Sequence, residues 1–116
     1  MPTQKLPPLT EAQFQTQVVQ LARLHGWWTW HDLDSRRNQA GLPDLLLVRE
    51  VVIWVELKTD TGRVRPAQQE CMDRLRKAGA DVRLWRPKNW PEIVETLTGV
   101  IPKIPDLPGQ NYLFQE

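Results

Sequence analysis

The stretch "GLPDLLLVREVVIWVELK", from Gly41 to Lys58, decides the fold of this 116-residue chain. Its two runs of Leu, Val and Ile are typical of neighbouring buried strands, and the polar residues between them are typical of a turn. Asp44, Glu56 and Lys58 lie in or beside these strands. Because a buried charge costs free energy unless it is paired or binds a metal, the stretch predicts a partner for these groups.

The length of the turn decides whether Asp44 and Glu56 meet. A two-residue turn at Arg49-Glu50 places the two acids on opposite faces, whereas a three-residue loop over 49–51 sets them directly opposite each other. The second register also forms an apolar set on the other face: Leu45 with Val55 and Leu47 with Ile53. A shift of one residue moves every side chain to the other face, so we predict the three-residue loop or a bulge.

The composition indicates one globular domain, with 41% hydrophobic and 25% charged residues. The net charge of +1 neither requires nor excludes a nucleic-acid partner. A single cysteine, Cys71, excludes an internal disulfide and suits a reducing compartment. No apolar run has the length of a membrane span, and "MPTQKLPPLT" lacks the apolar region of a signal peptide. We therefore expect an intracellular, cytoplasmic protein without a membrane partner.

Helix and strand patterns alternate along the chain. Prolines predict an extended leader over residues 1–9, and Thr10 with Gln13 matches a capping box. Apolar residues at helical spacing then lead to Gly26, which predicts a helix over 11–25. The later patterns predict strands over 27–31, 44–48, 51–58 and 81–85, helices over 66–79 and 89–99, polar loops over 32–43 and 59–65, and a proline-rich tail over 100–116.

The order α-β-β-β-α-β-α predicts an α/β domain over residues 10–99, with a small mixed sheet flanked by helices. A strand, a crossover helix and a strand in its second half require at least one parallel pair. Apolar neighbours on both sides of Glu56 predict that its strand is central in the sheet. Six tryptophans include Trp27, Trp28 and Trp30 in "GWWTWH", and we expect the alternating ones to pack this strand into the core and not to stack on bases.

Two carboxylates and an amine on one face suit the hydrolysis of phosphate esters. Asp44 and Glu56 offer the hard oxygen ligands that Mg²⁺ prefers, and such a cation polarises a phosphodiester and lowers the pKa of bound water. Lys58, two residues after Glu56, shares its face and can position that water or stabilise phosphoryl charge. The pattern is short and common, so the alternative is an exposed Glu56–Lys58 pair on an edge strand, with Asp44 ending a turn.

Three segments, "GLPDLLLV", "VVIWVELK" and "GRVRPAQQECMDRLRKAGADVRLWRP", make the chain resemble the VRR-NUC branch of the PD-(D/E)xK nucleases over about residues 10–95. The resemblance implies a restriction-endonuclease-like fold and dependence on Mg²⁺, with Mn²⁺ as a substitute. Asp44, Glu56 and Glu11 would be the metal ligands, Lys58 the catalytic lysine, and Gln68 a residue near the site. For Glu11 the alternative is favourable placement against the dipole of its helix.

Small stand-alone members of that branch occur in phages and bacteria, and some resemble Holliday-junction resolvases that act as dimers. The resemblance therefore implies a homodimeric endodeoxyribonuclease acting on branched or junction DNA. A sequence-specific restriction-type nuclease and a catalytically inactive DNA-binding module of the same fold are the alternatives. The intact set of Asp44, Glu56 and Lys58 argues against the inactive module.

Contacts with the DNA backbone are expected from arginines in two loops, Arg36, Arg37, Arg63 and Arg65. Such non-specific phosphate contacts make binding weaken steeply with salt. The segment "HDLDSRRNQAG" resembles the loop that precedes the PD motif in phage forms, with His31, Asp34 and Arg36 as candidates, and a solvated polar loop is the alternative. No Cys or second His stands at ligand spacing from His31, which argues against a zinc site.

Overall fold

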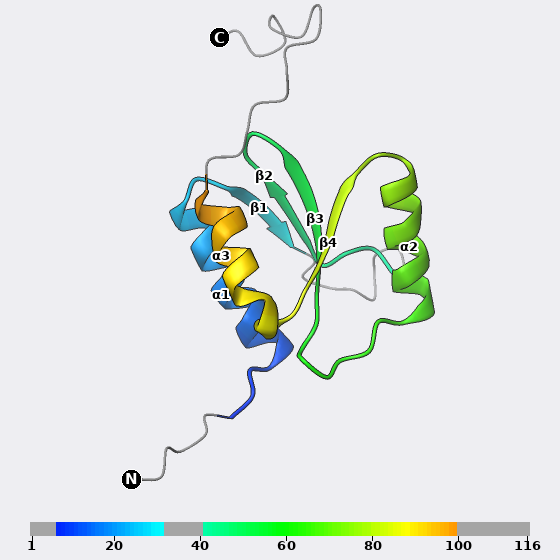
Figure 1. Cartoon of the computed structure of the whole chain (residues 1–116), viewed down its shortest axis with the longest axis horizontal. Helices are drawn as coiled ribbons and strands as arrows, with labels where there is room; N and C mark the ends of the chain where they lie inside the picture. The colour runs from blue at the N-terminus through cyan, green and yellow to red at the C-terminus, as the bar shows by residue number, and fades with distance from the viewer. Residues whose placement is uncertain (1–6, 32–40, 100–116) are drawn as a thin grey trace, which may run out of the picture.

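The computed structural model describes residues 7–31 and 41–99, which form one sheet with three α-helices (Figure 1). The elements are α1 (Glu11–Leu24), β1 (Trp28–His31), β2 (Leu45–Val48), β3 (Val52–Leu57), α2 (Pro66–Lys77), β4 (Asp81–Trp85), the 3₁₀ helix η1 (Pro87–Asn89) and α3 (Trp90–Thr98). The predicted order and α/β class are confirmed. Within the described ranges, none of the helices has the length and apolar character that a membrane crossing needs.

The four strands are arranged in the order β1-β2-β3-β4. β1 pairs with β2 and β2 with β3 in antiparallel fashion, whereas β3 and β4 are parallel and are connected through α2. The predicted parallel pair is therefore confirmed. β3, which carries Glu56, has a neighbour on each side, which confirms its predicted central place and leaves no edge on which Glu56 could be solvated.

The β2–β3 register is the one that a three-residue loop requires. Leu45 pairs with Val55 and Leu47 pairs with Ile53. The loop over residues 49–51 is closed by the Arg49 amide, which donates to the Val51 carbonyl at 3.0 Å. The three-residue loop is confirmed, and with it the alignment that brings the start of β2 to the end of β3.

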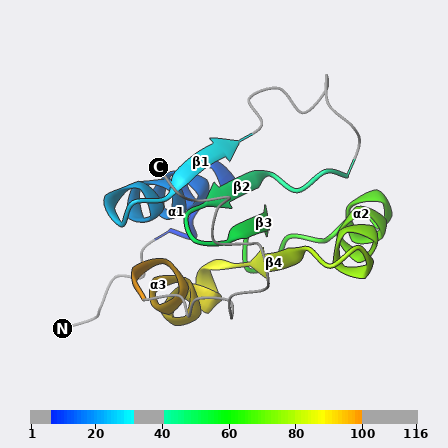
Figure 2. The same ribbon diagram turned by 90° about the horizontal axis from the view of Figure 1, so that it is seen from above.

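The two faces of the sheet are covered differently (Figure 2). α1 and α3 cover one face, and α2 lies on the other beside β4. The core under α1 and α3 contains the fully buried Phe14, Val18, Ala22, Leu45, Leu47, Val55, Leu57, Trp85, Ile93 and Leu97. Each large aliphatic or aromatic side chain buried there contributes about 1.5–3 kcal/mol, so this layer is the main source of stability.

The start of α1 is fixed by the predicted capping box. The Thr10 hydroxyl accepts a hydrogen bond from the Gln13 amide at 3.1 Å, and the Gln13 side-chain oxygen accepts one from the Thr10 amide at 2.9 Å. Both bonds satisfy backbone donors that the first helical turn leaves free. Glu11 is thereby fixed as the first helical residue, at the end of α1 nearest the acidic cluster described below.

Arg49 connects the β2–β3 loop to the carboxyl ends of α1 and α3 through its side-chain contacts. Its guanidinium lies 4.7 Å from the centre of the Trp27 ring, a cation–π contact. It also donates to the carbonyls of His25 at 3.1 Å and Gly99 at 2.8 Å, just beyond the carboxyl ends of α1 and α3. A cation is favoured there by the helix dipoles, so one side chain couples both helices to the hairpin.

The expected packing of the tryptophan strand is wrong for two of its residues. Trp27 is buried, but Trp28 is 59% exposed and Trp30 is 37% exposed. The physical reason is that strand alternation turns both residues away from the face that α1 and α3 cover, while α2 lies over the β4 side of the opposite face.

Gly41 allows the chain before β2 to lie against the first turn of α2. Its φ of +89° is unfavourable for residues with a side chain, and a Cβ there would lie 2.3 Å from the Ala67 carbonyl oxygen. Gly79, after α2, has a similar φ of +96°, but a Cβ there would meet no atom of the described residues within 4 Å.

Gly41→Ala is therefore expected to lower the free energy of unfolding by about 2–4 kcal/mol, since a steric clash adds to the backbone strain. Gly79→Ala carries the backbone strain alone and is expected to cost about 1 kcal/mol. Urea unfolding followed by circular dichroism measures both. Equal losses in the two variants would contradict the close approach at Ala67.

Candidate metal centre

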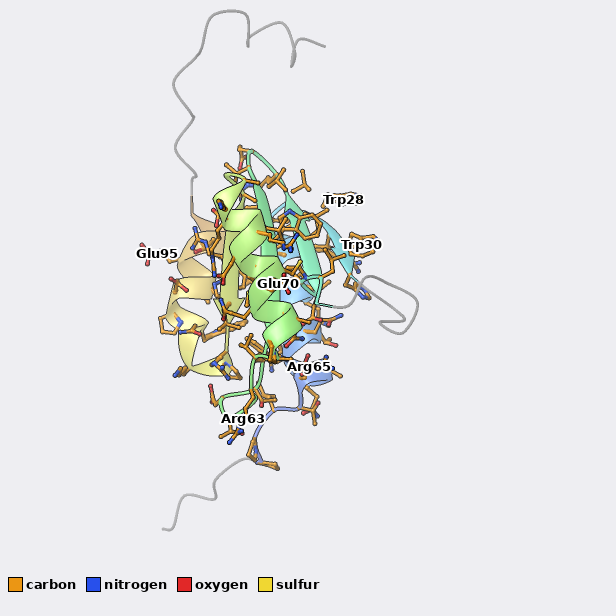
Figure 3. All side chains as sticks on the ribbon, turned by 90° about the vertical axis from the view of Figure 1, so that its right-hand side faces the viewer. Trp28, Trp30, Arg63, Arg65, Glu70 and Glu95 are labelled. Atoms are coloured by element: carbon orange, nitrogen blue, oxygen red, sulfur yellow. The ribbon has the colours of Figure 1, made fainter. Side chains whose placement is uncertain are left out.

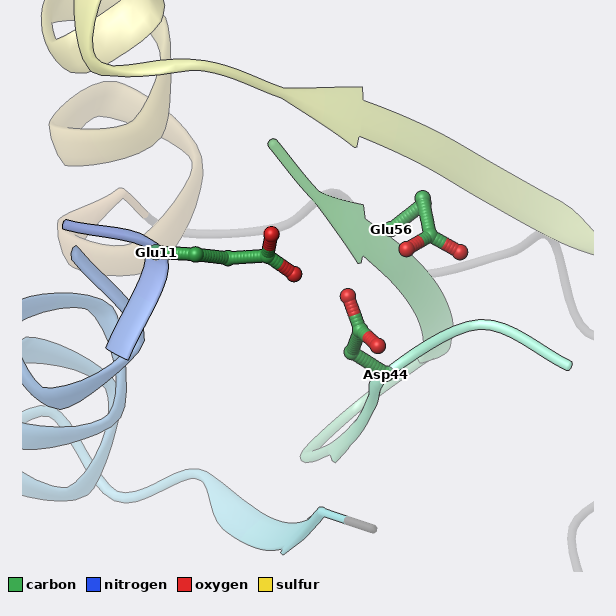
Figure 4. A group of neighbouring side chains, drawn as sticks. All are labelled: Glu11, Asp44 and Glu56. Carbon is green, nitrogen blue, oxygen red and sulfur yellow. The ribbon is translucent and has the colours of Figure 1, made fainter. Parts of the chain in front are cut away.

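Three carboxylates converge at one end of the sheet (Figure 4). Glu11 comes from the first turn of α1, Asp44 from the residue before β2, and Glu56 from β3. One oxygen of each lies within 4.8 Å of the others. Three like charges this close are unfavourable unless they bind protons or a cation.

Asp44 is held in place by the backbone of β3. Its Oδ2 accepts a hydrogen bond from the Leu57 amide at 3.2 Å. This contact depends on the observed register, because a shift of one residue would move Asp44 relative to β3 and turn its side chain to the other face. The loop length over residues 49–51 thus fixes the position of a carboxylate at the opposite end of the hairpin.

Glu56 is fully buried. Its Oε1 accepts a long hydrogen bond of 3.5 Å from the side-chain amide of Gln68, which is itself buried. The Gln68 oxygen in turn accepts from the Arg65 amide at 2.9 Å, so the start of α2 holds the glutamine in position. The Glu56 Oε2 is buried and has no hydrogen-bond partner in the described part of the chain. Such an atom is costly to leave without a partner.

Burial raises the pKa of Glu56 to about 9, and the neighbouring Asp44 and Glu11 carboxylates add to the rise while Lys58 opposes it. Partial burial and Asp44 also raise the pKa of Glu11, against the opposing effect of Lys58 and Arg65. Without a cation, Glu56 therefore holds a proton at neutral pH.

Lys58 is the cation closest in sequence to this cluster. It follows β3 directly, is 7% exposed, and shares the face of Glu56 by strand alternation. Its amide donates to the Trp85 carbonyl at 3.1 Å, which continues the β3–β4 pairing through this residue. Its effect on the pKa values of both Glu56 and Glu11 places its ammonium near the two acids.

The loop after Lys58 is held by a residue to which sequence reasoning gave no role. The Arg86 guanidinium donates to the carbonyls of Thr59 at 2.6 Å and Gly62 at 2.7 Å. Arg63 and Arg65, both exposed, extend from this loop at the N-terminal end of α2 (Figure 3). The only sequence signal for Arg86 was its place after a strand and before Pro87 in a segment of the family resemblance.

The structure thus brings together five of the predicted site residues: Glu11, Asp44, Glu56, Lys58 and Gln68. Arg63 and Arg65 lie nearby at the start of α2, on the exposed surface. His31 ends β1 opposite Leu45 and does not belong to the acidic cluster. Asp34, Arg36 and Arg37 lie outside the described residues.

The cluster fits a hard divalent cation. Its donors are all carboxylates, which suit Mg²⁺ or Mn²⁺ and not the thiolate and imidazole sites typical of structural zinc. The Oε2 of Glu56, unpaired within the part of the chain that the structure describes, favours a ligand here, because a bound cation would give this buried atom a partner.

The pKa of Glu56 predicts how stability depends on pH when no divalent metal is present. The folded state keeps a proton that the unfolded state loses above about pH 4.5, so unfolding releases a proton between that pH and about 9. Raising the pH within this window should lower the free energy of unfolding by up to about 1.4 kcal/mol per unit. Urea unfolding in EDTA at pH 5 to 8 measures the slope.

Glu56→Gln should flatten this slope and remove most of the stabilisation that Mn²⁺ gives to the wild type. Glu95→Gln, at an exposed site on α3 away from the cluster (Figure 3), is the matched control and should behave like the wild type. The same pH slope in wild type and Glu56→Gln would show that Glu56 is not the titrating group.

Comparison with known proteins agrees with this arrangement. The sequence profile of the VRR-NUC domain family matches residues 5–89, a range that contains the whole acidic cluster. A solved structure of a VRR_NUC domain protein aligns with a TM-score of 0.66 at 20% sequence identity, over 87% of this chain and 99% of that chain. At that identity the likeness concerns the fold alone. No curated protein matches the chain.

Proposed function

The chain belongs to the VRR-NUC family, nucleases of the PD-(D/E)xK type, and we propose that it is a metal-dependent endodeoxyribonuclease. The observation that carries this proposal is the buried Oε2 of Glu56, which has no hydrogen-bond partner among residues 7–31 and 41–99, in a group of three carboxylates with oxygens within 4.8 Å of one another. Lys58 beside the acids supplies the positive charge that phosphoester hydrolysis needs next to a metal.

Glu11, Asp44 and Glu56 would hold Mg²⁺, with Mn²⁺ as a substitute. When bound, the cation supplies Lewis-acid polarisation of the phosphodiester and a water of lowered pKa. Lys58 orients the attacking water or stabilises the charge that develops on the phosphoryl oxygens. Gln68 is a positioning residue, because it holds the Glu56 carboxylate from the first turn of α2.

The DNA backbone would run past the loop over residues 59–65. Arg63 and Arg65 are exposed there, and Arg86 holds the loop through two carbonyls. Side chains on an ordered loop lose less freedom when they bind a phosphate. Arg36 and Arg37, outside the described residues, are proposed as further phosphate contacts.

The proposed substrate is branched DNA such as a Holliday junction, and the proposed active form is a homodimer. A domain of this size offers little surface for reading a base sequence, so the geometry of the DNA is the more accessible feature. A four-way junction has two equivalent strands to cut, which two copies of one active site related by two-fold symmetry would match.

The direct test is cleavage of a panel of branched and linear DNAs with Mg²⁺ or Mn²⁺, together with the solution mass of the protein. Glu56→Gln and Lys58→Met are each expected to reduce the cleavage rate by about 10²–10³-fold or more, while DNA binding is retained. Glu95→Gln should cleave like the wild type.

Two outcomes of this panel would favour other functions. Binding without cleavage under every metal condition would indicate an inactive DNA-binding module. Cleavage of linear duplex at fixed sites, without regard to branch points, would indicate a restriction-type nuclease.

The proposed DNA path predicts the salt dependence of binding. Arg63→Ala with Arg65→Ala should lower the slope of log K against log salt by about 0.9 for each phosphate of duplex DNA that the variant no longer neutralises. Arg74→Ala is the control, since this side chain is 80% exposed on α2 and pairs with Glu70. Fluorescence anisotropy in metal-free buffer measures the slopes. Equal changes of slope in Arg74→Ala and in the Arg63/Arg65 variant would contradict the proposal that the DNA backbone runs past the loop over residues 59–65.

A further inference from the structure

Two tryptophans stand exposed on the sheet face that α2 only partly covers. Trp28 and Trp30, labelled in Figure 3, project from the same side of β1, at the edge of the sheet opposite β4 and α2. The strand register continues this surface across the sheet, since Trp28 pairs with Val48, Trp30 with Leu46 and Val48 with Val52. We call these five residues the open aromatic face: Trp28, Trp30, Leu46, Val48 and Val52.

The open aromatic face is apolar, with Trp28, Trp30 and Val52 exposed and Leu46 and Val48 half-buried. Val52 is 51% exposed, like the two tryptophans it accompanies. None of the five residues is charged. Exposed large apolar side chains gathered on one surface mark a binding site more often than isolated ones do. Because two of the side chains are tryptophan rings, a ligand with flat apolar faces would fit this surface.

This surface is continuous with the acidic cluster. Leu46, on β2, lies two residues beyond Asp44, which directly precedes that strand, and it pairs with Trp54, which lies two residues before Glu56. Two residues along a strand span about 7 Å, and adjacent strands lie about 4.8 Å apart. Trp30, which pairs with Leu46, is therefore about 8 Å from the backbone position of Asp44 and about 12 Å from that of Glu56, a span of one to two nucleotides.

The positive charges around the acidic cluster indicate how a bound DNA strand would be oriented. Lys58 directly follows β3, two residues after Glu56, and Arg63 and Arg65 are exposed in the loop that leads from Lys58 to α2. A phosphate backbone crossing the acidic cluster would meet these cations on one side. On the other side its bases would reach a surface with aromatic rings and no charge.

Stacked DNA bases are a more suitable ligand for this surface than another folded protein. Stacking on an aromatic side chain is worth about 1–3 kcal/mol per base and tolerates any sequence. Trp28 and Trp30, two residues apart, are separated by about 7 Å, roughly twice the 3.4 Å rise between stacked bases. The faces of bases within a duplex are covered by their neighbours, so only unpaired bases can stack here.

We propose that the open aromatic face binds unpaired DNA bases adjacent to the phosphate that is cut. This inference rests on the proposed nuclease function and narrows its substrate to DNA with a single-stranded segment beside the cleavage point, such as a flap or an opened junction. Trp28 and Trp30 are then specificity-determining residues, and the acidic cluster performs the chemistry.

The test compares two DNAs, a blunt duplex and the same duplex with a ten-thymidine tail, using the full chain. Binding is measured in Ca²⁺ buffer and cleavage in Mg²⁺ or Mn²⁺ buffer. The variant Trp28→Thr/Trp30→Thr keeps β-propensity and should bind the tailed DNA about 10–100-fold more weakly, with less than about threefold change for the blunt duplex. Trp28→Tyr/Trp30→Tyr should restore most of the binding.

Leu24→Ala is the matched control. Leu24 is an apolar residue, 78% exposed at the end of α1, so its replacement should leave both affinities unchanged. If the double threonine variant does not fold, the single Trp28→Thr change at the more exposed site is used and should still reduce tailed-DNA binding selectively.

Three results would overturn the inference. The wild type could bind both DNAs equally, or the threonine variant could lose affinity for both alike. A dimer in the wild type that becomes a monomer in the threonine variant, by sedimentation, would assign the face to a second copy of the chain. Absence of cleavage by the wild type would instead count against the nuclease function, because the binding comparison does not depend on it.

Discussion

The burial of one carboxylate constrains the rest of this structure. Glu56 lies on the central strand β3, fully removed from solvent, with one oxygen held by Gln68 and the other without a partner among the described residues. An ionised carboxylate in such a place is unfavourable by several kcal/mol unless a proton or a cation neutralises it. Bringing Glu11 and Asp44 to the same point raises that penalty, and a bound divalent cation removes it for all three groups.

The stability of the fold and the positions of the three acids have separate origins. Its stability comes mainly from the apolar layer under α1 and α3, which the acids do not enter. The position of each acid comes from a local device: the capping box for Glu11, the three-residue loop and the Leu57 amide for Asp44, and Gln68 for Glu56. Removal of a single device would therefore disturb the site while leaving the fold in place.

Much of this arrangement follows from the sequence, because alternation and helix capping are local effects. The elements, the parallel pair, and the register that aligns Asp44 with Glu56 could be predicted, since only that register gives a consistent apolar face. The exposure of Trp28 and Trp30 could not, because it depends on where α2 packs, and the sequence of β1 carries no information on that. The role of Arg86 likewise depends on its hydrogen bonds to a loop 24 to 27 residues away.

The most direct test of the central idea is a crystal structure of the wild-type protein grown with Mn²⁺, with anomalous diffraction data. We expect a single strong anomalous peak, or a close pair, bonded to oxygens of Glu11, Asp44 and Glu56 at about 2.1–2.3 Å, with the Glu56 Oε2 among the ligands. No anomalous density at this end of the sheet, with the three side chains turned to separate surroundings, would contradict the metal centre.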